Sequence, residues 1–108
     1  MNNTNDRHQA DELDRHKINL ETGEIGWQEL QRHFASGRLV SVAHDLDLVA
    51  VAHEFFRDNK KQLEQWLTSG RVHPVSDSQA ARWHEAEASL WAVVIKPWVL
   101  VQGPEGDS

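Results

Sequence analysis

Histidine and carboxylate side chains are the residues of this sequence that could bind a metal. One of the seven histidines, His53, is followed by Glu54, as at the start of the His-Glu-x-x-His pattern that holds zinc on one helix face. The fourth position after His53 is Arg57, so the second histidine ligand is missing. This pair therefore does not predict a zinc site.

A second polar cluster, His44, Asp45 and Asp47, lies between a predicted strand and a predicted helix. Such a loop could offer a histidine and a carboxylate to a metal. Capping explains the carboxylates better, because a negative side chain accepts hydrogen bonds from the free N–H groups of a helix and suits its dipole. We therefore predict neither a metal nor a cofactor, and retain His44, Asp45 and His73 as weak pocket candidates.

Patterns for nucleophilic and phosphate chemistry are missing. The sequence has no cysteine, which excludes thiolate catalysis and thiolate metal ligands. No serine lies in a Gly-x-Ser-x-Gly elbow, and the foldable part has no glycine-rich phosphate loop. Glu85 and Glu87 are two residues apart on a predicted helix, so they point to different sides. We expect no catalytic residue, and the sequence leans away from an enzyme.

The chain is tryptophan-rich, with five tryptophans and no tyrosine. Core packing explains the three that lie on predicted helix stripes, which are Trp27, Trp66 and Trp83. Trp91 and Trp98 instead flank a bend at Pro97, next to Lys96, in the most apolar segment of the chain. The stem of Lys96 can lie along the strand while its ammonium reaches water, or this group can bind an anion or a partner. Trp91, Lys96 and Trp98 are our candidate binding residues.

Apolar spacing predicts the elements that position these side chains. The predicted helices cover residues 27–36, 46–57, 60–69 and 76–88, and the predicted strands cover 39–42, 71–75, 90–95 and 98–102. Asn59 with Gln62 resembles a capping box and divides 46–69 into two helices, a single kinked helix being the alternative. The result is an α+β fold with the order α-β-α-α-β-α-β-β and a sheet of three or four strands.

Composition predicts a single domain over residues 17–102. Residues 1–16 contain three apolar groups and are predicted to be a disordered polar tail, and residues 103–108 a flexible one. The net charge of −6 makes nucleic acid an unlikely partner, because basic residues are scattered and are densest at Arg57, Lys60 and Lys61. No apolar run is long enough for a membrane span, and the absence of cysteine favours the cytoplasm.

Three stretches carry a family pattern: residues 25–30 (IGWQEL), residues 74–80 (PVSDSQA) with Trp83 after them, and residues 96–102 (KPWVLVQ). Together they resemble a bacterial family of uncharacterised small proteins, numbered 2288 in the domain-of-unknown-function series. The resemblance spans residues 17–102, and Gly26 stands where a proline is expected, which makes the helix entry less rigid. It implies a bacterial cytosolic protein and brings no known activity, cofactor or catalytic residue.

Residues 90–101 lead to our principal functional hypothesis. The segment is apolar on both faces, so each face must be covered by helices or by another chain. A small sheet offers little cover, and tryptophan is enriched at interface hot spots. We therefore expect a non-enzymatic interaction or binding module, homodimeric through 90–101. The alternative is a small enzyme or ligand-binding protein with a polar pocket near His44, Asp45, His73 and Lys96.

Overall fold

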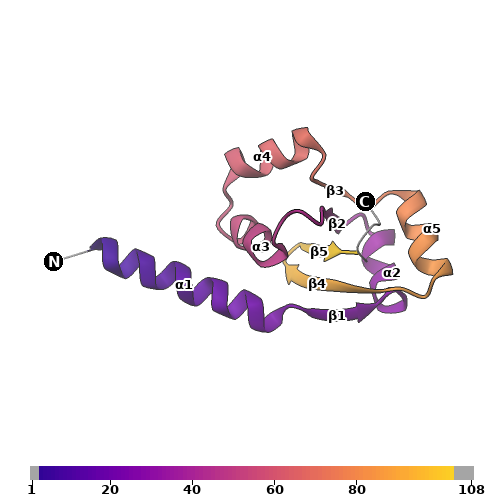
Figure 1. Cartoon of the computed structure of the whole chain (residues 1–108), viewed down its shortest axis with the longest axis horizontal. Helices are drawn as coiled ribbons and strands as arrows, with labels where there is room; N and C mark the ends of the chain where they lie inside the picture. The colour runs from indigo at the N-terminus through magenta and orange to yellow at the C-terminus, as the bar shows by residue number, and fades with distance from the viewer. Residues whose placement is uncertain (1–2, 104–108) are drawn as a thin grey trace.

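The computed structural model describes residues 3–103, with side chains from Glu12 onward. Figure 1 shows the strands at the centre of the molecule, with the first helix extending away from them toward the N-terminus. The helices are α1 (Asn3–Glu21), α2 (Trp27–Ala35), α3 (Leu48–Phe56), α4 (Lys60–Ser69) and α5 (Asp77–Glu85). The strands are β1 (Gly23–Gly26), β2 (Leu39–Val42), β3 (Val72–Pro74), β4 (Ser89–Ile95) and β5 (Trp98–Gln102).

The strands form one mixed sheet in the order β1-β4-β5-β2-β3. Neighbouring strands are antiparallel except β2 and β5, which run parallel. The two apolar strands of the predicted association segment, β4 and β5, therefore lie inside the sheet, and the edges are the short strands β1 and β3. A cis peptide bond joins Lys96 to Pro97 in the turn between β4 and β5.

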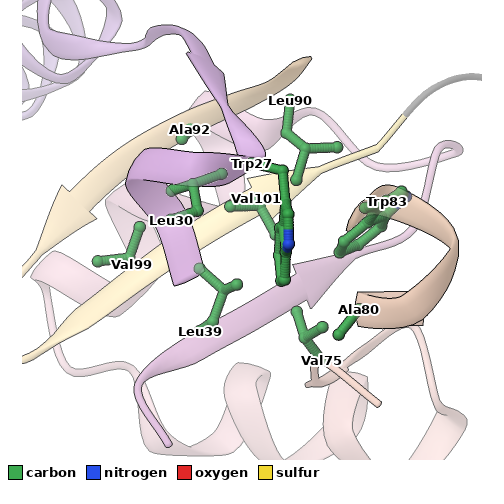
Figure 2. Packing of buried hydrophobic residues seen from close by; sticks show 10 residues of the cluster. All are labelled: Trp27, Leu30, Leu39, Val75, Ala80, Trp83, Leu90, Ala92, Val99 and Val101. Atoms are coloured by element: carbon green, nitrogen blue, oxygen red, sulfur yellow. The ribbon is translucent and has the colours of Figure 1, made fainter. Parts of the chain in front are cut away.

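One face of the sheet packs against α2 and α5. Trp27 lies at the centre of this core, with ring centroids 5.9 Å from both Phe34 and Trp83 (Figure 2). Alternate residues of the strands face these helices, since side chains along a strand point to opposite faces in turn. The buried cluster consists of Trp27, Leu30, Leu39, Val75, Ala80, Trp83, Leu90, Ala92, Val99 and Val101.

The other face packs against α1 and α3, with α4 beside them. The buried cluster there consists of Ile18, Val40, Val42, Leu48, Val51, Ala52, Val72, Val93 and Leu100. The predicted two-sided apolar segment is thus covered by one helix layer on each face. Trp66 of α4 packs against the edge of this second core and is only half-buried.

Polar side chains determine where the helices begin. The Asp47 carboxylate accepts a hydrogen bond from the N–H of Val49 at 3.0 Å. The Asn59 side chain accepts one from the N–H of Gln62 at 3.3 Å, so residues 48–69 form two helices and not a single kinked one. The predicted boundaries of α4, β2 and β5 agree with the structure, and those of the remaining predicted elements differ by a few residues.

Two elements near the N-terminus are not among those predicted from the sequence. Residues 3–16, for which the sequence predicts a disordered tail, lie in α1, whose contacts with the domain include the buried Ile18 and a hydrogen bond from Arg15 Nε to His53 Nδ1 at 3.3 Å. Strand β1 was not predicted because two of its four residues are glycine, and it brings the sheet to five strands. The predicted tail 103–108 lies outside the described residues except for Gly103.

A buried polar contact ties α5 to the sheet. The Gln79 side chain accepts from the N–H of Ser76 at 3.1 Å and donates to Ser41 Oγ of β2 at 3.1 Å. Ser76 Oγ accepts from the N–H of Gln79, which completes a capping box. The Gln79 side chain therefore caps the start of α5 and also joins this helix to β2.

Replacing this glutamine tests the contact. Gln79→Ala removes both side-chain bonds, takes away this partner of the buried Ser41 hydroxyl and breaks the capping box at Ser76, so it should lower the free energy of unfolding by about 2 kcal/mol. Urea unfolding followed by circular dichroism measures this loss. Gln65→Ala on the exposed side of α4 is the matched control, and equal midpoints for the two variants would contradict the role of Gln79.

The C-terminal end of the described chain packs against a tryptophan ring. A Cβ atom on Gly103 would lie 2.8 Å from Cζ2 of Trp83, and Trp83 is fully buried and cannot move aside. Gly103→Ala should therefore destabilise the fold by about 1–3 kcal/mol, the usual cost of overpacking. Gly23→Ala, where a Cβ meets no atom within 4 Å, should unfold close to wild type. Coincident denaturation curves for the two alanine variants would show that the Trp83 contact is not tight.

Candidate interaction site

The predicted association segment is mostly enclosed by its own helices. The buried residues of 90–101 are Leu90, Ala92, Val93, Val99, Leu100 and Val101. Trp91, Val94 and Trp98 remain exposed over 49%, 49% and 39% of their surface. Much of the apolar surplus that led to the dimer hypothesis is therefore accounted for within one chain.

The three exposed residues do not form a continuous patch. Val94 lies on the face covered by α2 and α5, because it alternates with the buried residues of the other core. Trp91 and Trp98 share the opposite face but sit at opposite ends of the β4–β5 pair, with Val93 and Leu100 buried between them. Trp98 borders a hollow with an entirely apolar lining, and Val94 borders a second groove whose lining mixes apolar and charged residues.

This hollow, which we name the Trp98 cleft, lies between the sheet, α3 and α4. It is lined by six apolar residues: Val40, Phe55, Leu63, Leu67, Pro74 and Trp98. Its volume is about 240 Å³, below the roughly 300–1,000 Å³ of most small-molecule pockets. A cleft of this size and composition suits an apolar anchor side chain of a protein partner better than a metabolite.

Helix α4 explains why the cleft is open. Leu63 and Leu67 are four residues apart and so lie on one face of the helix, which lines the cleft. The opposite, outer face presents Lys61, Glu64 and Thr68. No residue of α4 is buried, and Leu67 is 53% exposed. The helix is amphipathic, yet its own domain covers its apolar face only in part, at Leu63 and Trp66.

Two cationic residues, Lys60 and Arg38, are close in the chain to residues that line the Trp98 cleft, whose own lining is apolar. Lys60 lies one turn before Leu63 on the same face of α4. Arg38 immediately precedes β2, its carbonyl accepts from the N–H of Val99 at 3.0 Å, and strand alternation puts it on the face of Val40, beside Trp98. Both are exposed, and neither forms an ion pair within the part of the chain that the structure describes. The cleft therefore combines an apolar lining with two cations near its rim, one of which, Lys60, has Glu64 one turn after it on α4.

The predicted polar pocket does not assemble. Lys96 lies in the β4–β5 turn, at the end of the sheet where β2 begins, whereas His44 and Asp45 follow the end of β2. Asp45 instead forms an ion pair with Arg71 at 3.2 Å, and His73 Nδ1 hydrogen-bonds the Pro74 carbonyl at 2.8 Å. Parallel pairing of β2 with β5 therefore places Lys96 at the other end of the sheet from His44 and Asp45.

Lys96 instead faces a groove beside α1. This groove has a volume of about 690 Å³ and is shared with Asp14, Lys17 and Glu21 of α1 and with Phe56 of α3. The exposed lysine therefore has carboxylates of the same chain across from it. Its surroundings fit the simpler prediction of a solvated lysine head at the end of a strand.

Histidines in the described chain do not gather into a metal site. His53 is almost fully buried, and its Nδ1 accepts the hydrogen bond from Arg15 of α1. No group of three or more histidine, aspartate or glutamate side chains within the described residues is arranged to hold a metal ion. The observed role of His53 is to join α1 to α3.

Sequence reasoning identified Trp98 but not the other residues of the Trp98 cleft. The helical spacing of Phe55, Leu63 and Leu67 predicts apolar stripes, and a stripe looks the same in sequence whether or not something covers it. The signal that was available is the short β3 edge strand with Pro74, which gives α4 little sheet to pack on.

Comparison with known proteins places this α+β domain, a sheet with helices on both faces, in a family. Residues 14–103 match the family model described as "Protein of unknown function (DUF2288)", and the chain belongs to that family, as its sequence pattern predicts. The chain is also similar to the NMR solution structure of PA1075 from Pseudomonas aeruginosa, with 38% identity, a TM-score of 0.75 and coverage of 85% of each chain. No curated protein matches it. Among residues 3–103, no helix has the length and apolar character that a membrane span requires.

An anionic apolar dye tests whether the Trp98 cleft is accessible. Anilinonaphthalene sulfonate should bind to the cleft in dilute solution, because its rings suit the apolar floor and its sulfonate suits Arg38 and Lys60. Leu67→Asp should abolish most of the fluorescence increase by removing apolar surface and adding a like charge. Thr68→Asp places the same charge on the outer face of α4 and should leave dye binding unchanged. Equal dye binding by the two variants would locate the dye elsewhere.

Proposed function

We propose that this protein is a non-enzymatic interaction module that associates with a second copy of itself through the Trp98 cleft. The observation that carries the proposal is α4, an amphipathic helix none of whose residues is buried. An apolar helix face normally packs against a core. Exposed apolar surface with a polar rim is typical of a protein interaction site.

Trp98 is a suitable anchor for such an interface. It begins β5, whose ladders to β4 and β2 fix its backbone on both sides. A rigidly held tryptophan loses little side-chain entropy on binding, and tryptophans are enriched among hot-spot residues. This retains the 90–101 segment in the interface but assigns the contact to its Trp98 end, together with α4.

Self-association is favoured over a small ligand by the shape and lining of the cleft. The opening is small, it is lined by apolar side chains, and the polar residues expected for a reaction lie at two ends of the sheet. Two-fold dimers are the commonest assemblies of soluble proteins, and their symmetry doubles the area gained from each contact. We place this module in the bacterial cytoplasm, because the chain has no cysteine and has a relative in Pseudomonas aeruginosa.

Sedimentation velocity tests the proposed function. The wild-type protein should form dimers at tens of micromolar and dissociate on dilution. Leu67→Asp should be monomeric over the same range, and Trp98→Ala should weaken the dimer by about tenfold or more.

Thr68→Asp is the control for this experiment, since it adds the same charge one residue further along α4 and should dimerise like wild type. Circular dichroism checks that each variant is folded. A wild-type protein that stays monomeric, or a Leu67→Asp variant that dimerises normally, would overturn the proposal.

A further inference from the structure

Helix α1 has an apolar face that its own domain does not use. Leu13 and Leu20 are 69% and 70% exposed, the two highest values among the large apolar residues of the described chain. They are seven residues apart, so they lie within about 20° of each other around the helix. Ile18, which anchors α1, is on the other side. The two leucines therefore form a stripe that points away from the domain.

Acidic residues flank this stripe. Glu12, Asp14 and Glu21 lie to its sides, together with the exposed cation Lys17, and Asp14, Lys17 and Glu21 also line the groove that they share with Lys96. Arg15 is exposed too, and it lies on the side of the helix away from the leucines, where its Nε donates to His53 Nδ1. The leucine face of α1 is therefore apolar at its centre and has three carboxylates and one lysine at its margins, which suits an apolar cleft with Arg38 and Lys60 nearby.

We propose that the Leu13/Leu20 face of α1 docks in the Trp98 cleft of a second copy of the chain, and that the second copy returns the contact. This inference rests on the proposed function and identifies the segment that occupies the cleft. The contact is an amphipathic helix in an apolar groove, with leucine anchors and carboxylates paired to the cations near its rim.

Within one chain the same contact is prevented by the way α1 is held. Ile18 and Arg15 fix the helix against α3 with its leucines facing outward, and β1 begins two residues after α1 ends. Figure 1 shows the helix extending away from the sheet, where it is free to reach another molecule. The leucine stripe can therefore meet a cleft only in trans.

The amount of apolar surface also favours a second copy. One cleft of about 240 Å³ offers a small contact, and stable interfaces bury roughly 1,200–2,000 Å² in total. A reciprocal exchange uses the contact twice, once in each direction. It also covers four of the seven exposed large apolar residues of the described chain, namely Leu13, Leu20, Leu67 and Trp98.

The double variant Leu13→Asp/Leu20→Asp tests the exchange, by which we mean the reciprocal docking of α1 of each copy in the Trp98 cleft of the other. Both positions are exposed, so the variant should fold normally while its dimer dissociates at about tenfold or higher concentration than the wild-type dimer. Asn19→Asp adds a charge to a different face of α1 and should leave sedimentation unchanged. A double variant that dimerises like wild type would overturn the exchange and leave the proposed function standing, since Leu67→Asp would still dissociate the dimer.

Mixing two variants gives a second, independent readout. Leu13→Asp/Leu20→Asp keeps an intact cleft, and Leu67→Asp keeps an intact α1, so an equimolar mixture can form one of the two reciprocal contacts. The mixture should therefore associate more strongly than either variant alone. A mixture as monomeric as its components would overturn the exchange.

Cross-linking shows which segments meet. Because the chain has no cysteine, Leu20→Cys and Leu67→Cys each introduce a single thiol. A short bismaleimide should link the two variants to each other when mixed, and link each variant to itself far less. Preferential linking of Leu20→Cys to itself would show that α1 pairs with α1 and would overturn the docking in the cleft.

Discussion

The pairing of β4 with β5 is the constraint on which the rest of the structure depends. In its register Ala92 lies opposite Val101 and Val93 opposite Leu100, so each successive pair faces a different helix layer. A shift of one residue would exchange the two faces and bury the wrong side chains against both layers. The register therefore positions α2 and α5 on one side and α1 and α3 on the other. The apolar character of this segment on both faces follows from that double role.

The same arrangement determines where apolar surface is left over. The helices cover the middle of the β4–β5 pair, and its ends project beyond them, where Trp91 and Trp98 are half exposed. At the Trp98 end the next helix, α4, lies against the short edge strand β3 and does not close over the sheet. The cleft is thus a consequence of three helices sharing one face of a narrow sheet. Its openness results from topology as much as from the residues that line it.

Local chemistry made much of this fold predictable from the sequence. Asn59 and the Ser76–Gln79 box specify helix starts through their own backbone contacts, and β-branched runs specify β2 and β5. Strand β1 could not be predicted, because Gly23 and Gly26 have no strand preference and it forms by pairing with β4. Trp98 was recognisable as a binding candidate, but its partner Leu67 was not. Whether an apolar stripe is covered depends on strand order, which local patterns do not encode.

Helix α1 has few contacts with its own domain, which is the physical basis of the prediction of a disordered N-terminus. The polar N-terminus was predicted to lack enough apolar surface to offset the entropy of ordering, and one buried side chain, Ile18, anchors the described part of the helix. Helices in water gain most of their stability from tertiary packing of an apolar face. In the exchange that we propose, the second copy supplies that packing to Leu13 and Leu20, so dimerisation and the ordering of α1 stabilise each other. The helix is then weakly held in the monomer for the same reason that it can bind in the dimer, because its leucines face away from its own domain.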